Sequence, residues 1–353
     1  MARRLLLLLA LLLGTPLAAQ DFTPVQPGRV MAFPADHGAH PDFRTEWWYA
    51  TGWLTTAGGE KLGFQVTFFR SRVGDAAGNP SKFALKQVLF AHAALSDPKL
   101  GRLQHAQRIA RAGFGLAEAR TGDMALVLDD WSLRRGADGV MRTQVKGDGF
   151  ALDLALAPSQ PVLLQGRGGY SQKGPDPAEA SHYYTMPQLK VSGRIVRAGK
   201  AEAVTGTAWL DREWSSTLLN PAATGWDWLG LNMDDGGALT LFRVRRKDGS
   251  ALWAGGSYRS AKGELTVLAP ADVRFVAARR WKSSRTGATY PVAPVVEVRL
   301  PGGVRRVPVT PLMDDQELDS RGGGGPVYWE GAVTVPGGRG YLEMTGYLTP
   351  LKM

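Results

Sequence analysis

Alternation of apolar and polar residues with a period of two is the feature that most constrains the fold of this chain. In residues 62–69, the side chains of Leu62, Phe64, Val66 and Phe68 fall on one side, and those between them fall on the other. This pattern is typical of a β-strand with one buried face, and helical periodicity is scarce. Comparable runs occur at residues 124–128, 150–156, 188–195, 295–300 and 341–347. Glycine-rich turns separate several of these runs, so we predict an all-β fold, a sandwich or a barrel.

The chain also repeats one plan. Four features recur in the same order: Glu46-Trp47 and Glu213-Trp214, Gly52-Trp53 and Gly225-Trp226, Gly58-Gly59 and Gly236-Gly237, Tyr183-Tyr184 and Tyr328-Trp329. Such self-similarity indicates a duplicated structural unit. Each half is long enough for a closed barrel of roughly eight strands, and closure removes exposed strand edges. We therefore predict two tandem antiparallel β-barrels, formed by residues 20–205 and 206–353.

Residues 1–19 have the order of a secretory signal peptide. A short positive segment precedes a leucine-rich stretch, and small residues ending at Ala19 follow it. The apolar stretch is about half the length needed to span a bilayer, which argues against a retained anchor. We therefore expect cleavage after Ala19 and a periplasmic or secreted protein.

The composition narrows the possible chemistry. The 353 residues include no cysteine, which excludes disulfides, thiolate metal sites and cysteine nucleophiles. The net charge is +10, but the basic residues are scattered, so no nucleic-acid partner is expected. One basic run, at residues 243–247, is interpreted as a solvated strand end rather than as an anion site. The sequence has no dinucleotide fingerprint, phosphate loop or Gly-x-Ser-x-Gly elbow, and we expect no cofactor.

Several longer blocks carry a resemblance to a known family. They are residues 33–49 and 51–54, residues 208–214 (Ala-Trp-Leu-Asp-Arg-Glu-Trp), residues 225–228 (Gly-Trp-Asp-Trp), and residues 328–331 with 340–347. With these blocks the chain resembles the AttH / carotenoid 1,2-hydratase family, also described as predicted secreted hydrolases. The resemblance implies two lipocalin-like (calycin) barrels side by side.

The activity implied by the resemblance is less definite. Members of the family include hydratases of acyclic carotenoids, fungal cyclisation enzymes, and secreted bacterial proteins that are often encoded near ABC transporters. The chain departs from the carotenoid hydratases at Arg212-Glu213-Trp214, where those enzymes have His-Asn-Trp. The resemblance therefore does not single out carotenoid chemistry.

A cluster of ionisable residues lies near the start of the first block. Asp36, His37, His40 and Glu46 place two imidazoles and two carboxylates within eleven residues. A carboxylate that orients a histidine can move protons near neutral pH, so we predict Asp36, His37 and His40 as catalytic residues. In one alternative, His37, His40 and Glu46 bind zinc or iron, but their spacing on a loop is unfavourable and no metal is predicted. In another, Asp36 and His37 hold the entry segment across a barrel end.

Five carboxylates lie beside or between tryptophans: Glu46, Asp211, Glu213, Asp227 and Glu330. Burial among aromatic side chains raises the pKa of a carboxyl group and makes it a proton donor. We therefore predict Glu213 and Glu330 as further catalytic residues, and favour Glu330 because its surroundings are not duplicated. The alternative is a set of buried salt bridges with arginines, which we favour for Glu46 with Arg44 and for Asp211.

Aromatic residues near these carboxylates are suited to line an apolar pocket for a lipid or an isoprenoid. The predicted ligand-binding residues are Trp47, Trp48, Tyr49, Trp214, Trp226, Asp227, Trp228, Tyr328 and Trp329. In the alternative interpretation, tryptophans such as Trp53 and Trp226 plug the closed end of a lipocalin-type barrel.

Three functions follow from these predictions. The first is binding of a hydrophobic small molecule or lipid, followed by acid–base hydration or a related lyase or isomerase step. The second is binding alone, with transfer of the ligand to an ABC transporter in the membrane. The third is a structural adaptor with filled barrels. Fold analogy does not decide among them.

Overall fold

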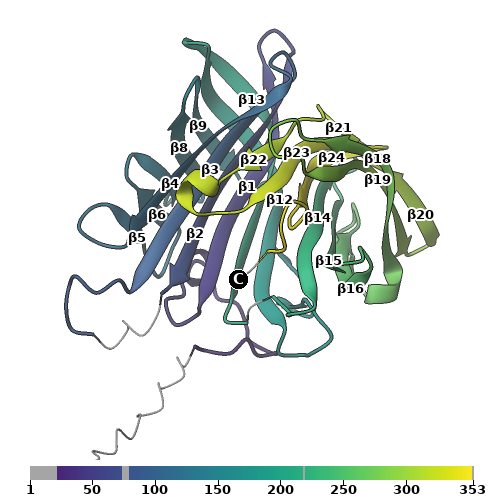
Figure 1. Cartoon of the computed structure of the whole chain (residues 1–353), viewed down its shortest axis with the longest axis horizontal. Helices are drawn as coiled ribbons and strands as arrows, with labels where there is room; N and C mark the ends of the chain where they lie inside the picture. Colours follow the sequence, from purple (N-terminus) through teal and green to yellow (C-terminus); the bar gives the residue numbers. More distant parts are fainter. Residues whose placement is uncertain (1–21, 74–78, 218, 352–353) are drawn as a thin grey trace, which may run out of the picture.

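The computed structural model describes residues 22–73, 79–217 and 219–351. These residues form β-strands joined by turns and loops, together with the short 3-10 helices η1 (Ala35–His37), η3 (Pro270–Asp272) and η4 (Arg321–Gly323). Within them, no helix has the length and apolar character needed to cross a membrane. The signal peptide expected at residues 1–19 lies outside the described residues. The all-β prediction is confirmed (Figure 1).

The first β unit is one large antiparallel sheet. Its strands are β1 (Thr45–Thr56), β2 (Lys61–Arg72), β3 (Gln87–Asp97), β4 (Arg102–Arg111), β5 (Ala117–Ala119), β6 (Ala125–Leu128), β7 (Trp131–Arg135), β8 (Met141–Gly147), β9 (Phe150–Ala157), β10 (Leu163–Leu164), β11 (Tyr170–Gln172), β12 (Ala180–Arg197) and β13 (Lys200–Ser215). Their order in the sheet is β4-β3-β2-β1-β13-β12-β9-β8-β7-β6-β5, with β10 and β11 paired to β12. The sheet curls until β4 contacts β6 and β8, which makes it an almost closed barrel (Figure 1).

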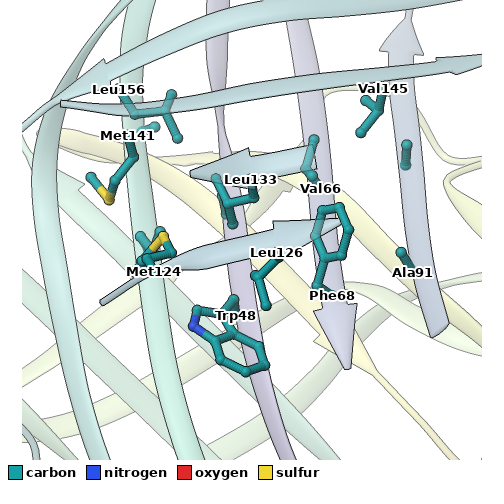
Figure 2. Close-up of a cluster of buried hydrophobic side chains, with 14 of the residues drawn as sticks. Trp48, Val66, Phe68, Ala91, Met124, Leu126, Leu133, Met141, Val145 and Leu156 are labelled. Atoms are coloured by element: carbon teal, nitrogen blue, oxygen red, sulfur yellow. The ribbon is translucent and has the colours of Figure 1, made fainter. Parts of the chain in front are cut away.

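The interior of this barrel is filled by its own side chains. Alternate residues of the strands point inward, and Trp48, Phe64, Phe68, Leu126 and Trp131 are all fully buried there. Figure 2 shows several of them, with Trp48 and Phe68 on either side of Leu126. Burial of each large apolar side chain contributes about 2 kcal/mol to folding. The centre of the first unit is therefore a packed core.

The second β unit consists of two sheets. Its strands are β14 (Ala223–Met233), β15 (Ala238–Arg246), β16 (Ala251–Arg259), β17 (Leu265–Leu268), β18 (Val273–Lys282), β19 (Thr289–Leu300), β20 (Gly303–Pro308), β21 (Thr310–Pro311), β22 (Glu317–Asp319), β23 (Val327–Val335) and β24 (Gly338–Met344). An eight-stranded sheet has the order β17-β16-β15-β14-β24-β23-β21, with β22 paired to β23, and β18-β19-β20 form a separate sheet. Apolar residues of both sheets, including Leu241 and Val296, share one core. The second unit thus differs from a single continuous barrel sheet.

The two units share a topological plan. In the first, β1 lies between β2 and the returning strand β13, and in the second, β14 lies between β15 and the returning strand β24. This local strand order is the same in both units. One detail of the expectation was wrong: Glu213-Trp214 does not open the second unit, because it lies at the end of β13. The boundary placed between residues 205 and 206 accordingly falls within β13, and the change of sheet comes after Ser215.

The units meet through the outer face of the first sheet. On β1, Trp48 points into the barrel, whereas Tyr49 and Trp53 point toward the second unit and join its aromatic residues. Figure 1 shows β23 crossing the face of the first sheet, where it contacts β2. Gly63 on β2 permits this approach, because a Cβ atom there would lie 2.6 Å from the Cβ of Ala332 and from the hydroxyl of Tyr341. We call this region the contact face.

Candidate functional site

Carboxyl groups from both units are buried at the contact face. Leu210 and Trp214 of β13 point into the first barrel, so Asp211 and Glu213 point outward to the second unit. In the second unit, Trp228 of β14, Glu343 of β24 and Glu330 of β23 lie in one row across the sheet. Residues far apart in the sequence therefore meet here because of strand register.

Glu330 is the most enclosed of these groups, with 1% of its surface exposed. The Tyr49 hydroxyl donates a hydrogen bond to Oε1 of Glu330, and Nε2 of Gln65 donates to Oε2 at 3.3 Å. Burial raises the pKa of Glu330 well above its usual range, and the charge of Glu343 raises it further, against the hydrogen bond from Tyr49. A neutral carboxylic acid is therefore favoured at this position.

Asp211 is the second buried acid. It accepts hydrogen bonds from the Tyr183 hydroxyl at 2.7 Å, the Thr185 hydroxyl at 2.5 Å and the Trp209 indole at 2.8 Å. Burial raises the pKa of Asp211 to about 7, although these hydrogen bonds act in the opposite direction. We expected a salt bridge between Asp211 and an arginine, and this expectation was wrong. Among the described residues, neutral hydrogen-bond donors contact the Asp211 carboxyl group instead of a guanidinium.

Two further carboxylates complete the group. Glu343, which the sequence analysis did not single out, faces Glu330 across the β23–β24 pairing. Burial raises the pKa of Glu343 to about 7, with smaller contributions from the charges of Glu213 and Asp211. Glu213 accepts a hydrogen bond from Ser181 and lies 3.2 Å from Nζ of Lys173. The alternation of Tyr341 and Glu343 in residues 341–347 was the available sign that Glu343 shares the face of Tyr341.

Aromatic side chains surround these acids. The rings of Tyr49 and Trp228 pack edge to face at 5.3 Å, and Trp209 packs against Trp228 at 6.1 Å. The Trp228 indole donates to the Tyr183 hydroxyl at 3.2 Å. On the other side, the Tyr328 hydroxyl lies 2.7 Å from Nδ1 of His92. The predicted residues Tyr49, Trp228 and Tyr328 thus lie at the contact face with Glu330.

A cavity of about 250 Å³ opens beside this group. Its walls come from both units, with Gln165, Tyr170 and Gln172 on one side and Phe242 and Trp253 on the other. Nε2 of Gln165 donates to the hydroxyls of Thr185 and Thr240, both at 2.8 Å. Because Thr185 also bonds Asp211, a short polar chain links the cavity wall to the buried acid.

The predicted residues Asp36, His37 and His40 lie elsewhere, at one end of the first barrel. Nδ1 of His37 lies 2.6 Å from the Tyr184 hydroxyl, and the His40 ring stacks on Trp214 at 3.9 Å with Nε2 3.0 Å from Asp36. Burial lowers the pKa of His37 to about 4. The geometry matches the alternative in which this segment closes a barrel end, and it does not bring these residues together with Glu213 and Glu330.

Glu46 anchors that barrel end. Its carboxylate pairs with the guanidinium groups of Arg70 and Arg212, and all three side chains are fully buried. Burial opposes ionisation, but Arg212 and the hydrogen bond with His40 hold the pKa of Glu46 far below its usual range. A buried salt bridge was expected for Glu46, but Arg44 was the wrong partner. Among the described residues, no group of three or more His, Asp and Glu side chains is arranged to hold a metal ion.

The other predicted ligand-binding residues are dispersed. Trp48 and Trp214 lie in the first barrel, and Trp329 lies in the core of the second unit. Trp47 and Trp226 are partly buried beside the contact face. Asp227 points to the opposite side of β14 from Trp228. These positions separate the predicted set into core residues and contact-face residues.

Fold and site together define a class of protein: a two-unit, all-β protein with a filled first barrel and buried acids between its units. A family model described as AttH-like matches residues 24–347. The chain therefore belongs to the AttH-like family, as its sequence resemblance indicated.

Solved structures agree with this assignment. A crystal structure assigned as AttH from Nitrosomonas europaea is 53% identical, covers 92% of this chain and 100% of that chain, and has a TM-score of 0.86. Kievitone hydratase from Nectria haematococca is 15% identical, covers 93% and 96%, and has a TM-score of 0.69. CghA, solved with Sch210972, is 13% identical, covers 87% and 89%, and has a TM-score of 0.53. The last two are similar in fold, and the lipocalin-like class is confirmed. No curated protein matches the sequence.

Proposed function

We propose that this chain is exported, binds a lipid or an isoprenoid between its two units, and processes it by acid–base hydration or a related lyase or isomerase step. One observation carries the proposal: Asp211 and Glu330, which come from different units, are buried among aromatic side chains, and burial raises the pKa of both. Titratable groups perturbed in this way are typical of proton-transfer sites. The name of kievitone hydratase, which has the same fold, describes chemistry of this class.

Hydration of a carbon–carbon double bond needs a proton donor and a water molecule. In the proposed reaction, the Glu330 carboxyl group gives its proton to one alkene carbon, and the π-electron pair forms the new C–H bond. Water adds to the cationic carbon and loses a proton to the ionised carboxylate of Asp211, from which the proton returns to Glu330. The ring faces of Tyr49 and Trp228 stabilise the cation. The reverse sequence is a lyase reaction, and loss of a different proton gives an isomer.

The place of the ligand follows from the packing of the units. Because side chains fill the first barrel, the cavity bounded by Gln165 and Phe242 is the candidate entrance to the contact face. Glu213, paired with Lys173, is assigned a supporting role near this entrance. Asp36, His37 and His40 are assigned to closure of the barrel end.

The filled barrel also favours a second candidate function, the structural adaptor. A protein of this kind binds no apolar molecule at defined stoichiometry, and its buried acids only join the units. Binding without turnover, with delivery to an ABC transporter, is the third possibility, and it differs from the first only in the role of Glu330.

The test begins with native mass spectrometry of the protein purified from the periplasm of its own host, with solvent extraction of bound molecules. We expect one apolar molecule per chain. Incubation of that molecule with the protein in isotopically labelled water should then produce a hydrated species that carries the label. A persistently empty protein, also after incubation with lipid and isoprenoid extracts, contradicts binding and supports the adaptor.

Matched variants separate the functions. Glu330→Gln keeps an acceptor for Tyr49 and should retain the ligand but lose turnover. Trp228→Ala should lose the ligand, whereas Trp281→Ala, in the separate β18–β20 sheet, should keep both properties. Turnover that survives Glu330→Gln contradicts the acid role, and ligand binding without any labelled product supports the transfer protein.

A further inference from the structure

A second cleft lies away from the contact face, at one end of the second unit. It has a volume of about 520 Å³ and opens between β15, β18 and the chain after Met344. Four basic side chains line it, Arg243, Arg245, Lys247 and Arg280. The interpretation of residues 243–247 as a solvated strand end holds for Arg246 and Lys247, which are exposed, but is wrong for Arg245, which is only 5% exposed.

One buried carboxylate organises the two arginines. Asp227 pairs with Nε of Arg243 at 2.6 Å and with Nε of Arg245 at 3.1 Å, and it accepts a hydrogen bond from Tyr347. The guanidinium of Arg245 also lies over the Tyr347 ring at 3.8 Å. These contacts hold both arginines in fixed positions and leave an excess positive charge, because one carboxylate faces two guanidinium groups.

The remaining charges of the cleft add to this excess. Within the described residues, neither Lys247 nor Arg280 has a carboxylate partner at salt-bridge distance, and Asp248 is the acidic residue of the lining. Concave surfaces lined by one sign of charge concentrate the electrostatic potential and attract counter-ions. Arginine suits an oxyanion because its planar guanidinium donates parallel hydrogen bonds.

The first unit contains a similar group of charged side chains. There, too, a buried carboxylate lies between two arginines, Glu46 between Arg70 and Arg212. The segment with His40 covers that arrangement, and Arg70 and Arg212 donate to backbone carbonyls of the segment. In the second unit, Arg243 and Arg245 also donate to backbone carbonyls, those of Phe275 and Thr345, but both side chains line an open cleft.

We propose that this cleft binds a phosphate-type oxyanion, either free or as the headgroup of an amphiphile. Arg243 and Arg245 form the fixed base of the site, and Lys247 and Arg280 complete it at the rim. Ala277, Pro291 and Leu348 add apolar surface beside the charges, which suits the carbon chain next to a headgroup. The site is separate from the contact face and does not depend on the proposed hydration chemistry.

The test measures the binding of two sources of phosphate to the wild-type protein and to a double variant at the rim of the cleft. Binding of inorganic phosphate is measured by calorimetry, and binding of vesicles is measured by sedimentation, with phosphatidylcholine alone or with about one-fifth phosphatidic acid. In the double variant Lys247→Glu/Arg280→Glu, affinity should fall about tenfold or more. Both side chains lie at the rim, so folding is checked by circular dichroism and should be retained.

A matched double variant controls for net charge. Arg305→Glu/Arg306→Glu makes the same change of charge on exposed positions of β20, outside the cleft lining, and should leave the affinity unchanged. Binding of phosphate identifies a free oxyanion, and binding of acidic vesicles without binding of phosphate identifies a lipid headgroup. The proposal is overturned if neither probe binds, or if both double variants weaken binding equally.

Discussion

The hydroxyl of Tyr49 hydrogen-bonds to the carboxyl group of Glu330, and the two residues belong to different β units. Tyr49 lies on β1, between β2 and β13 in the first sheet, and Glu330 lies on β23 of the second unit. Burial raises the pKa of both groups well above their usual ranges. The bond therefore joins two neutral groups, so the units can meet through a polar contact without a buried charge.

The raised pKa of Asp211 predicts a specific dependence of stability on pH. The folded protein holds the Asp211 proton up to about pH 7, whereas the unfolded chain releases it near 3.8. The stability from the protonated group is therefore complete below about pH 4 and lost as the pH rises through 7. Relative to Asp211→Asn, the free energy of unfolding of the wild-type protein should fall by about 1 kcal/mol per pH unit in this window. Urea unfolding of both proteins at several pH values measures the difference.

Comparison with the variant is necessary because buried histidines act in the opposite direction. Burial lowers the pKa of His92 to about 3 and that of His182 to about 4, so their contributions to stability increase with pH up to about 6.5. They cancel in the difference between the wild-type protein and Asp211→Asn. Thr185→Val removes a donor to the Asp211 carboxylate and should extend the decline above pH 7. A difference that is flat with pH contradicts the raised pKa.

The barrel-end salt bridge predicts a large loss of stability for Glu46→Gln. In this variant Arg70 and Arg212 stay buried, but an amide nitrogen replaces one of the two carboxylate oxygens that they contact. The negative charge that balances the two guanidinium groups is also lost. Loss of one partner of a buried ion pair costs about 3–5 kcal/mol, which chemical denaturation measures. Asp138→Asn, which breaks the exposed pair with Arg142, should change stability little. Equal effects of the two variants contradict the buried pair.

The period of two in the sequence was sufficient to predict the β-strands, but it did not assign their partners. Arg212, Glu213 and Trp214 are adjacent in the sequence, and alternation sends Arg212 and Trp214 into the barrel but Glu213 to the contact face. The sequence alone does not show which side of β13 faces the core, because that depends on the order of the strands in the sheet. Glu46 and Trp214 even lie opposite each other in the β1–β13 pairing, although they were taken as parts of two different units.

The candidate site shows the same limit. Glu330 was favoured because its Tyr-Trp-Glu surroundings are not duplicated, and the structure places its side chain in a buried position. Asp211 and Asp227 have equally aromatic neighbours, yet the first meets hydroxyl donors and the second meets two arginines. Those partners come from strands distant in the sequence, and register decides which of them approach.

A double-mutant cycle tests the structural role of His37. His37→Ala and Tyr184→Phe each remove one side of the contact between Nδ1 and the hydroxyl. Their effects on the free energy of unfolding should be non-additive by about 1 kcal/mol at pH 7. Because burial lowers the pKa of His37 to about 4, its contribution to stability is complete above about pH 6.5 and is lost as the pH falls toward 4. Additive effects at pH 7 contradict the contact.

The close approach at Gly63 predicts that a single methyl group disturbs the contact face. In Gly63→Ala, the new Cβ would lie 2.6 Å from the Cβ of Ala332 and from the Tyr341 hydroxyl, so β2 and the second unit must separate. Overpacking of this kind costs about 1–3 kcal/mol, which urea unfolding measures. Gly58→Ala is the matched control, since the nearest atom to its Cβ, the Thr56 hydroxyl oxygen, lies 3.8 Å away. If the two variants are equally stable, the units do not pack as closely as Gly63 indicates. If only Gly63→Ala is destabilised, the face that carries Tyr49 and Glu330 is a tight contact, and a ligand must enter from its edge.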